Sequence, residues 1–123
     1  MIPFSRADRV SGLIQEVLAE LLKKNIRDPR LAMATISSVK MSRDLKLARI
    51  YFTIYGGSEK SEAAAQGFES ARGFIKRSLA RRLGLRYMPD LKFFYDESFE
   101  YGSHIDQILE KISTDNGPDH QSD

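Results

Sequence analysis

Cysteine is absent from this 123-residue chain, which excludes disulfides and thiolate metal sites. No stretch approaches the roughly 18 apolar residues of a membrane-spanning helix. The first ten residues, MIPFSRADRV, lack the apolar core of a signal peptide. The chain also has no P-loop, no dinucleotide-binding glycine motif and no Gly-x-Ser-x-Gly motif. We therefore expect a cytoplasmic protein that uses no cofactor and is not an enzyme.

Length and composition predict one folded domain with a polar end. A chain of 123 residues with 41% hydrophobic and 29% charged residues is typical of a single globular domain. Residues 113–123, STDNGPDHQSD, contain three acidic residues and no basic one. We expect a domain over residues 1–112, followed by a disordered acidic tail over residues 113–123.

The first half of the chain predicts a helix followed by a β-hairpin. Apolar residues spaced by three and four predict a helix over Ser5–Asn25, with Ser5 and Asp8 as its capping box. Alternating patterns predict strands over Ala34–Met41 and Lys46–Tyr55. Because the link between the strands is short and polar, they should form an antiparallel hairpin.

The second half predicts a broken helix, a strand and a short helix. Residues Glu59–Leu85 are helical in composition but are interrupted at Gly73. A third strand should follow Pro89, and apolar spacing predicts a last helix over Ile105–Ile112. This order predicts an α+β fold, a three-stranded sheet with helices packed on one face.

Aromatic residues of the strands have two interpretations. Alternation places Phe52 and at least one of Phe93 and Phe94 in the core, and leaves Tyr51 and Tyr55 on an open face. Stacking on nucleic-acid bases is the alternative. Since Phe prefers the interior, we favour core packing.

Positive charge is concentrated between Ser70 and Pro89, a stretch that contains no Asp or Glu. The chain as a whole carries a net charge of only +2, so the remainder is net negative. A protein that gathers its positive charge on one segment has a directed electrostatic field, which favours a polyanionic partner. The basic residues of the stretch are Arg72, Lys76, Arg77, Arg81, Arg82 and Arg86.

Helical geometry divides this stretch into two sides. Ile75, Leu79 and Leu83 form an apolar stripe, and Arg77 and Arg81 lie roughly opposite it. The planar fork of an arginine suits phosphate oxygens. An ordinary solvated face is the alternative, but such a face usually mixes both signs of charge.

Two smaller motifs accompany the basic stretch. Ala71 and Gly73 flank Arg72, and because Gly costs about 1 kcal/mol inside a helix, a kink between two helices is one interpretation. An incidental Gly is the other. Arg43 lies in the hairpin link, where it either extends the basic surface or is an exposed turn residue.

An acidic cluster is formed by Asp96, Glu97 and Glu100. Paired carboxylates can bind a metal or carry out acid–base chemistry. No second cluster with ligand spacing supports this, so we predict solvated charges and no metal site. A dimer formed along the open sheet edge is a further alternative to the monomer that we expect.

The motifs together resemble the bacterial ribosome-binding factor A family. The resemblance extends from about Phe4 to Ile112. It is carried by Arg-Asp-Pro-Arg-Leu, Met-Ser-Arg-Asp-Leu, Gly-Phe-Ile-Lys-Arg and Met-Pro-x-Leu-x-Phe-Phe-Tyr-Asp in this order. It implies a type II KH-like fold with the order α-β-β-α-kink-α-β, in which an Ala-x-Gly kink, here Ala71-Arg72-Gly73, replaces the Gly-x-x-Gly loop of KH domains.

The resemblance also implies a function without catalysis. Members associate with free 30S subunits and assist late maturation of 16S rRNA, including processing of its 5′ end. They are linked to growth in the cold and to an assembly GTPase. Together with the segregated charge, it predicts an RNA interface in which Lys76, Arg77, Arg81 and Arg82 supply most phosphate contacts. Arg72 and Gly73 should set the kink, and Arg43 and Arg86 should be outer contacts. A KH-like RNA-binding module that is not dedicated to ribosomes is the alternative.

Overall fold

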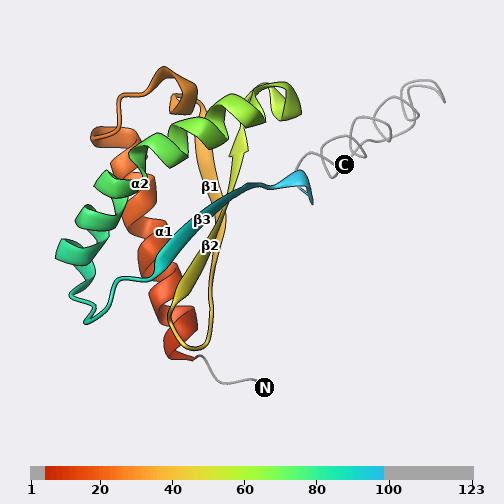
Figure 1. Ribbon diagram of the computed structural model, residues 1–123. Coiled ribbons are helices and arrows are strands. Elements are labelled where there is room, and N and C mark those ends of the chain that lie inside the picture. Colours follow the sequence, from red (N-terminus) through yellow and green to blue (C-terminus); the bar gives the residue numbers. More distant parts are fainter. Residues whose placement is uncertain (1–4, 99–123) are drawn as a thin grey trace, which may run out of the picture.

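The computed structural model describes residues 5–98, which form one α+β unit (Figure 1). The strands are β1 (Ala34–Met41), β2 (Leu47–Ile54) and β3 (Asp90–Tyr95). The helices are α1 (Arg6–Lys24) and α2 (Ser61–Leu83), and the short 3-10 helices are η1 (Pro29–Leu31) and η2 (Gly57–Lys60). Both α-helices lie on the same face of the sheet. This confirms the predicted fold class. The predicted last helix and acidic tail lie outside the described residues.

The sheet order is β1-β2-β3. β1 and β2 are antiparallel, as the short link predicted, whereas β3 runs parallel to β2. Parallel neighbours need a crossover connection, which α2 supplies by spanning the face of the sheet. The basic C-terminal half of α2 is therefore followed, after a short loop, by the edge strand β3.

The first helix begins at the predicted capping box. The Ser5 hydroxyl accepts a hydrogen bond from the Asp8 amide at 3.1 Å, and the Asp8 carboxylate accepts one from the Ser5 amide, also at 3.1 Å. The apolar stripe of α1 faces the sheet. Its buried residues are Ala7, Val10, Ile14, Val17, Leu18 and Leu21.

Aromatic rings occupy the centre of the core. Phe52 of β2 and Phe68 of α2 are fully buried. Their ring centroids lie 4.8 Å apart, and Phe68 stacks on Phe93 of β3 at 5.0 Å. The prediction of core packing is therefore confirmed for Phe52 and Phe93.

The kink predicted at Gly73 does not break the helix. The backbone hydrogen bonds of α2 run unbroken from Ser61 to Leu83, although Figure 1 shows the helix changing direction along its length. A Cβ added at Gly73 would meet only the guanidinium end of Arg77, at 3.3 Å. Helical geometry therefore does not require glycine at this position. Gly84, with a φ of 60°, ends the helix as predicted.

A different glycine of α2 is sterically constrained. A Cβ added at Gly67 would lie 3.1 Å from two side-chain carbons of Leu31 and 3.3 Å from the Cβ of Arg30. Leu31 is only 3% exposed and so has little room to move. Gly67 thus lets α2 approach η1 closely, a role that the sequence analysis did not assign.

Alanine substitutions should separate these two glycines. Gly73→Ala should raise the free energy of unfolding by about 0.5–1 kcal/mol, because alanine is the better helix former and its Cβ would meet only the far end of the flexible Arg77 side chain. Gly67→Ala gains the same propensity but must displace Leu31, and overpacking costs about 1–3 kcal/mol. We expect it to be destabilising in urea denaturation. Equal effects of both changes would contradict this account of packing.

Candidate nucleic-acid interface

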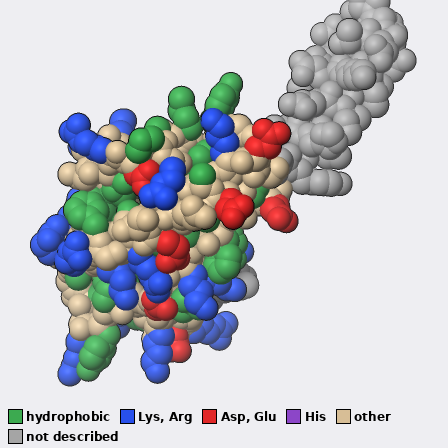
Figure 2. Space-filling view, turned by 45° about the horizontal axis from the view of Figure 1, so that its top comes forward, with side chains coloured by type: hydrophobic (Ala, Val, Ile, Leu, Met, Phe, Trp, Pro, Cys, Tyr) green, Lys and Arg blue, Asp and Glu red, His purple; other side chains and the backbone are tan. Residues whose placement is uncertain are grey.

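The outer side of α2 carries two arginines with unneutralised charge. Arg77 and Arg81 are exposed and make no ion pair with any residue between 5 and 98. Ile75 and Leu79, on the opposite side of the helix, are fully buried and fix its rotation. Figure 2 shows Lys and Arg side chains at the left edge of one face, where the C-terminal half of α2 lies in Figure 1, with Asp and Glu nearer the middle and right.

Arg72 and Lys76 are instead directed at the start of β3. The guanidinium of Arg72 donates a hydrogen bond to the Asp90 carboxylate, and Lys76 Nζ lies 3.8 Å from the same oxygen. Arg72 also lies 3.5 Å from Glu69. Both basic side chains are half-buried, about one third exposed. Their charge therefore ties α2 to β3 and is partly neutralised before any ligand binds.

The Asp90 carboxylate should make stability sensitive to acid. The hydrogen bond from Arg72 is the largest cause that lowers the pKa of Asp90, assisted by the charges of Arg72 and Lys76 and by the Leu91 amide. A carboxyl group whose pKa is lower in the folded state stabilises the fold at pH values above its unfolded pKa of about 3.9. This stabilisation is lost as the pH falls through the pKa of the folded state. Asp90→Asn should therefore weaken the acid dependence of unfolding below about pH 4.

Urea denaturation from pH 7 down to pH 3 measures this effect. The control is Glu59→Gln, an exposed carboxylate without an ion pair among the described residues. Parallel curves for the wild type and Asp90→Asn would show that the Arg72–Asp90 pair adds no acid-sensitive stability.

Arg82 connects the two helices. Its guanidinium donates a hydrogen bond to Glu20 of α1 at 2.8 Å, and Lys24 lies 3.8 Å from the same carboxylate group. The Arg82 hydrogen bond is the main cause that lowers the pKa of Glu20. Three of the seven predicted interface residues, Arg72, Lys76 and Arg82, are thus engaged in ion pairs within the fold.

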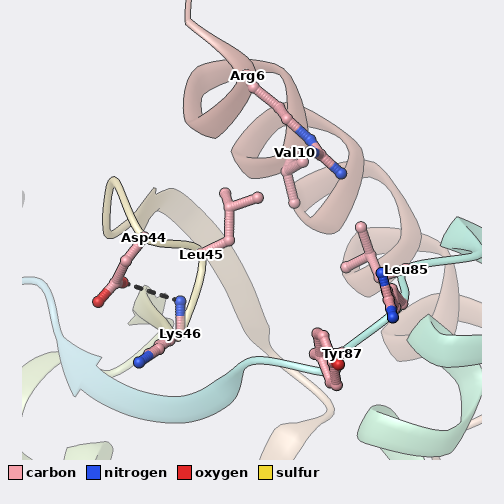
Figure 3. A pocket seen from close by; sticks show the side chains of 8 residues that line it. Arg6, Val10, Asp44, Leu45, Lys46, Leu85 and Tyr87 are labelled. Atoms are coloured by element: carbon pink, nitrogen blue, oxygen red, sulfur yellow. Dashed lines mark hydrogen bonds between the residues drawn. The ribbon is translucent and has the colours of Figure 1, made fainter.

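Arg86 lies beside a hollow formed by three segments. This hollow has a volume of about 290 Å³. Figure 3 shows Arg6 and Val10 reaching it from α1, Leu45 from the hairpin turn, and Leu85 from the loop after α2. Tyr87 and Lys46 also line it, and Arg86 lies over the Tyr87 ring at 5.4 Å. The basic rim therefore includes Arg6 and Lys46, which the sequence analysis missed because they are distant in the chain.

Arg43 occupies the hairpin turn as an exposed residue. The turn is held by the Ser42 hydroxyl, which donates to the Asp44 carboxylate at 2.6 Å, and this bond is the main cause that lowers the pKa of Asp44. Leu45 completes the turn with a φ of 62°. Arg43 makes no ion pair with a residue that the structure describes, so its charge is available at the surface.

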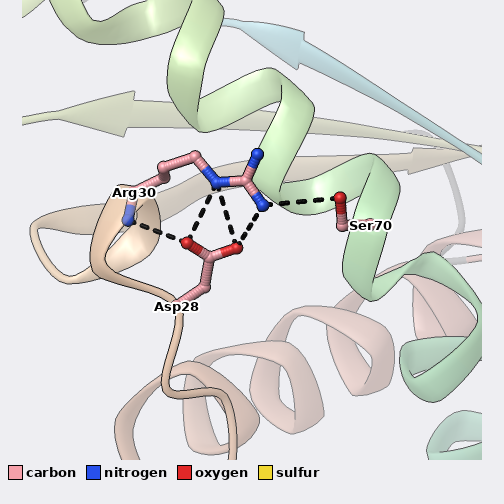
Figure 4. Close-up of polar contacts among 3 residues, drawn as sticks. All are labelled: Asp28, Arg30 and Ser70. Carbon is pink, nitrogen blue, oxygen red and sulfur yellow. Dashed lines mark hydrogen bonds and ion pairs between the residues drawn. The ribbon is translucent and has the colours of Figure 1, made fainter.

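Arg30, another basic turn residue, is committed to the fold. Figure 4 shows its guanidinium forked onto the Asp28 carboxylate, with nitrogen–oxygen distances of 2.7–3.2 Å. It also donates to the Ser70 hydroxyl of α2 at 3.4 Å. Asp28 in turn accepts from the Arg30 amide at 2.9 Å and begins η1. The Arg-Asp-Pro-Arg motif is therefore a helix stop that also contacts α2.

The acidic cluster is only partly described. Asp96 accepts hydrogen bonds from the hydroxyls of Ser37 and Ser98, at 2.6 and 2.5 Å, and Glu100 lies outside the described residues. Between residues 5 and 98 no group of three His, Cys, Asp or Glu side chains is arranged to bind a metal ion. Within the same range, no helix is long and apolar enough to cross a membrane.

A three-stranded sheet with two helices on one face, one antiparallel strand pair and one parallel pair places this chain in the class of small KH-like α+β domains. The family model of ribosome-binding factor A matches residues 6–109. The chain belongs to the ribosome-binding factor A family.

Individual relatives agree with this family. Ribosome-binding factor A of Desulfatibacillum aliphaticivorans is 51% identical over 119 residues, which is 97% of both chains. The crystal structure of ribosome-binding factor A from Thermus thermophilus superposes with a TM-score of 0.66 at 25% identity, covering 74% of this chain and 97% of that one. A homology model of the Thermus thermophilus protein, fitted into a cryo-electron microscopy map of its complex with the 30S subunit, superposes with a TM-score of 0.63 at 27% identity, covering 76% and 97%.

Proposed function

We propose that this protein binds the free 30S ribosomal subunit through 16S rRNA and assists the late maturation of that RNA, including processing of its 5′ end. It acts in the cytoplasm as a monomer and without catalysis, supports growth in the cold, and works together with an assembly GTPase. Membership of the ribosome-binding factor A family and the likeness to a relative placed in a 30S complex support this proposal. The observation that carries it is the exposed Arg77–Arg81 pair on α2.

The chemistry of the interface is electrostatic. Arg77 and Arg81 lie one helical turn apart, so both forks can reach neighbouring phosphates. Arg86 and Arg43 provide outer contacts. Lys76, Arg72 and Arg82 add positive potential while keeping α2 in place. Phosphate contacts position a protein without reading sequence, so recognition of 16S rRNA depends on its shape.

Cosedimentation with purified ribosomal subunits tests the proposal. We expect the protein to pellet with 30S subunits, to ignore 50S subunits, and to stay bound when an excess of unrelated RNA is added. If unrelated RNA displaces it as efficiently as 30S subunits do, a general KH-like RNA-binding module replaces this proposal. In cells, loss of the gene should lengthen the 5′ end of 16S rRNA, measured by primer extension. Normal ends in the deletion strain at low temperature would contradict the maturation role.

A further inference from the structure

The face of the sheet opposite the helices carries a row of three basic residues. Strand register places Lys40 of β1 opposite Arg49 of β2, and Arg49 opposite Lys92 of β3. All three are exposed. Ala48 and Ile50, the neighbours of Arg49 in β2, are fully buried against the helices. Because strand side chains alternate between faces, the three basic residues share the open face.

An aromatic pair lies in the adjoining row of the same face. Tyr51 is paired in register with Phe94, and their rings stack with centroids 5.5 Å apart and planes inclined by 30°. Lys40 Nζ lies 5.9 Å from the centre of the Tyr51 ring. Phe94 is 40% exposed, in contrast to the fully buried Phe52 on the other face. These two rings are therefore not part of the core.

The charge of this face is not balanced within the described part of the chain. Lys40, Arg49 and Lys92 make no ion pair with any residue between 5 and 98. Like charges on neighbouring strands oppose sheet formation, so the fold alone gives no reason for this row. One carboxylate, Asp96, lies at the end of β3 and accepts a hydrogen bond from Ser37. The surface is cationic beside a stacked aromatic pair in which Phe94 is exposed and Tyr51 is partly buried.

We propose that the open face of the sheet binds a single-stranded RNA segment, separately from the interface on α2. Unpaired bases stack on Tyr51 and Phe94, and the backbone phosphates contact Lys40, Arg49 and Lys92. The two rows lie two residues apart along the strands, about 7 Å, which a nucleotide spans from base to phosphate. Aromatic platforms beside basic side chains are how single strands are bound without sequence preference. A duplex hides its bases and cannot use the rings.

This proposal goes beyond the α2 interface and does not depend on it. The helices cover one face of the sheet and the aromatic pair lies on the other (Figure 1). One molecule could thus hold two RNA segments at once, a structured region at Arg77 and Arg81 and an unpaired strand at Tyr51 and Phe94.

Binding of the full chain to a fluorescent 12-nucleotide oligouridine, compared with an RNA duplex of equal length, tests the proposal. Tyr51→Leu/Phe94→Leu should weaken binding of the single strand by roughly tenfold or more, because stacking on at least one base is lost. Binding of the duplex should change by less than about twofold. The matched control is Leu13→Ala on α1, which truncates a side chain as exposed as Phe94, 40% for both, and should leave oligouridine binding unchanged.

Crosslinking identifies the surface directly and covers the case in which the double variant misfolds. Oligouridine containing 4-thiouridine should crosslink to peptides of β2 and β3 in the wild type. Crosslinks should persist in Arg77→Glu/Arg81→Glu and fall severalfold in Arg49→Gln/Lys92→Gln, whose changes are exposed and leave the core intact. Crosslinks confined to α2, or equal affinities of Tyr51→Leu/Phe94→Leu and wild type for oligouridine, would overturn the proposal. Capture of an acidic protein by this face with no RNA crosslink would also overturn it.

Discussion

Reversing the charge of Arg77 and Arg81 should weaken binding to the 30S subunit by about 100-fold or more. Each hydrogen bond to a charged group is worth about 1.5–3 kcal/mol, and two such bonds correspond to a loss of this size or larger. The fold should be unaffected, because neither side chain is buried or paired within the described residues. Binding of Arg77→Glu/Arg81→Glu can be measured by cosedimentation with purified subunits, with circular dichroism as the check on folding.

A control variant with the same change of net charge separates the contribution of the α2 surface to binding from the effect of the protein's overall charge. Arg9 and Lys23 of α1 are also exposed and make no ion pair with a residue of the described range. Arg9→Glu/Lys23→Glu should lower the affinity only slightly, through the long-range field. If this control variant loses as much affinity as Arg77→Glu/Arg81→Glu, the α2 assignment is wrong and general charge accounts for binding.

Truncating Phe68 should have the largest effect on stability. Phe68 is fully buried and contacts the rings of Phe52 and Phe93, so it joins α2 to β2 and β3. Removal of a buried phenylalanine side chain typically costs about 3–5 kcal/mol, a large part of the about 5–15 kcal/mol that stabilises most domains. We expect Phe68→Ala to be marginally folded at 25 °C in urea denaturation.

The matched control for Phe68→Ala is Leu13→Ala on α1. Leu13 is 40% exposed, so its truncation leaves little cavity and should cost well under about 1 kcal/mol. A Phe68→Ala variant that unfolds at the same urea concentration as Leu13→Ala would show that α2 is not anchored through this ring cluster.

Local sequence pattern was sufficient to predict the helices and strands and the outward direction of Arg77 and Arg81. The Ser5–Asp8 capping box, the alternation along β2 and the glycine stop at Gly84 each depend on residues close together in the chain. The apolar stripe of α2 fixed which way Arg77 and Arg81 point. These features follow from helix and strand periodicity alone, and the structure confirms them.

Long-range pairing was not predictable from local pattern. Asp90 is far from Arg72 in the chain, and their ion pair arises only because α2 crosses back to a strand that runs parallel to β2. The same is true of Arg82 and Glu20. Local pattern therefore does not reveal that Arg72, Lys76 and Arg82 are paired within the fold.

The packing around each glycine also depends on residues distant in the chain. Composition gives the helix cost of Gly73, but it does not show that a Cβ there would meet only the guanidinium end of Arg77. Gly67 has the same intrinsic cost, and its function is visible only once Leu31 is placed against it. The row formed by Lys40, Arg49 and Lys92 likewise required the register of three strands.

The salt dependence of 30S binding tests the central claim, that Arg77 and Arg81 contact RNA phosphates, most directly. Each phosphate contact contributes about 0.7–0.9 to the slope of log affinity against log salt concentration. Arg77→Gln/Arg81→Gln should therefore flatten the slope by about 1.4–1.8 relative to wild type, while Arg9→Gln/Lys23→Gln should leave it unchanged. An unaltered slope for Arg77→Gln/Arg81→Gln would contradict the claim.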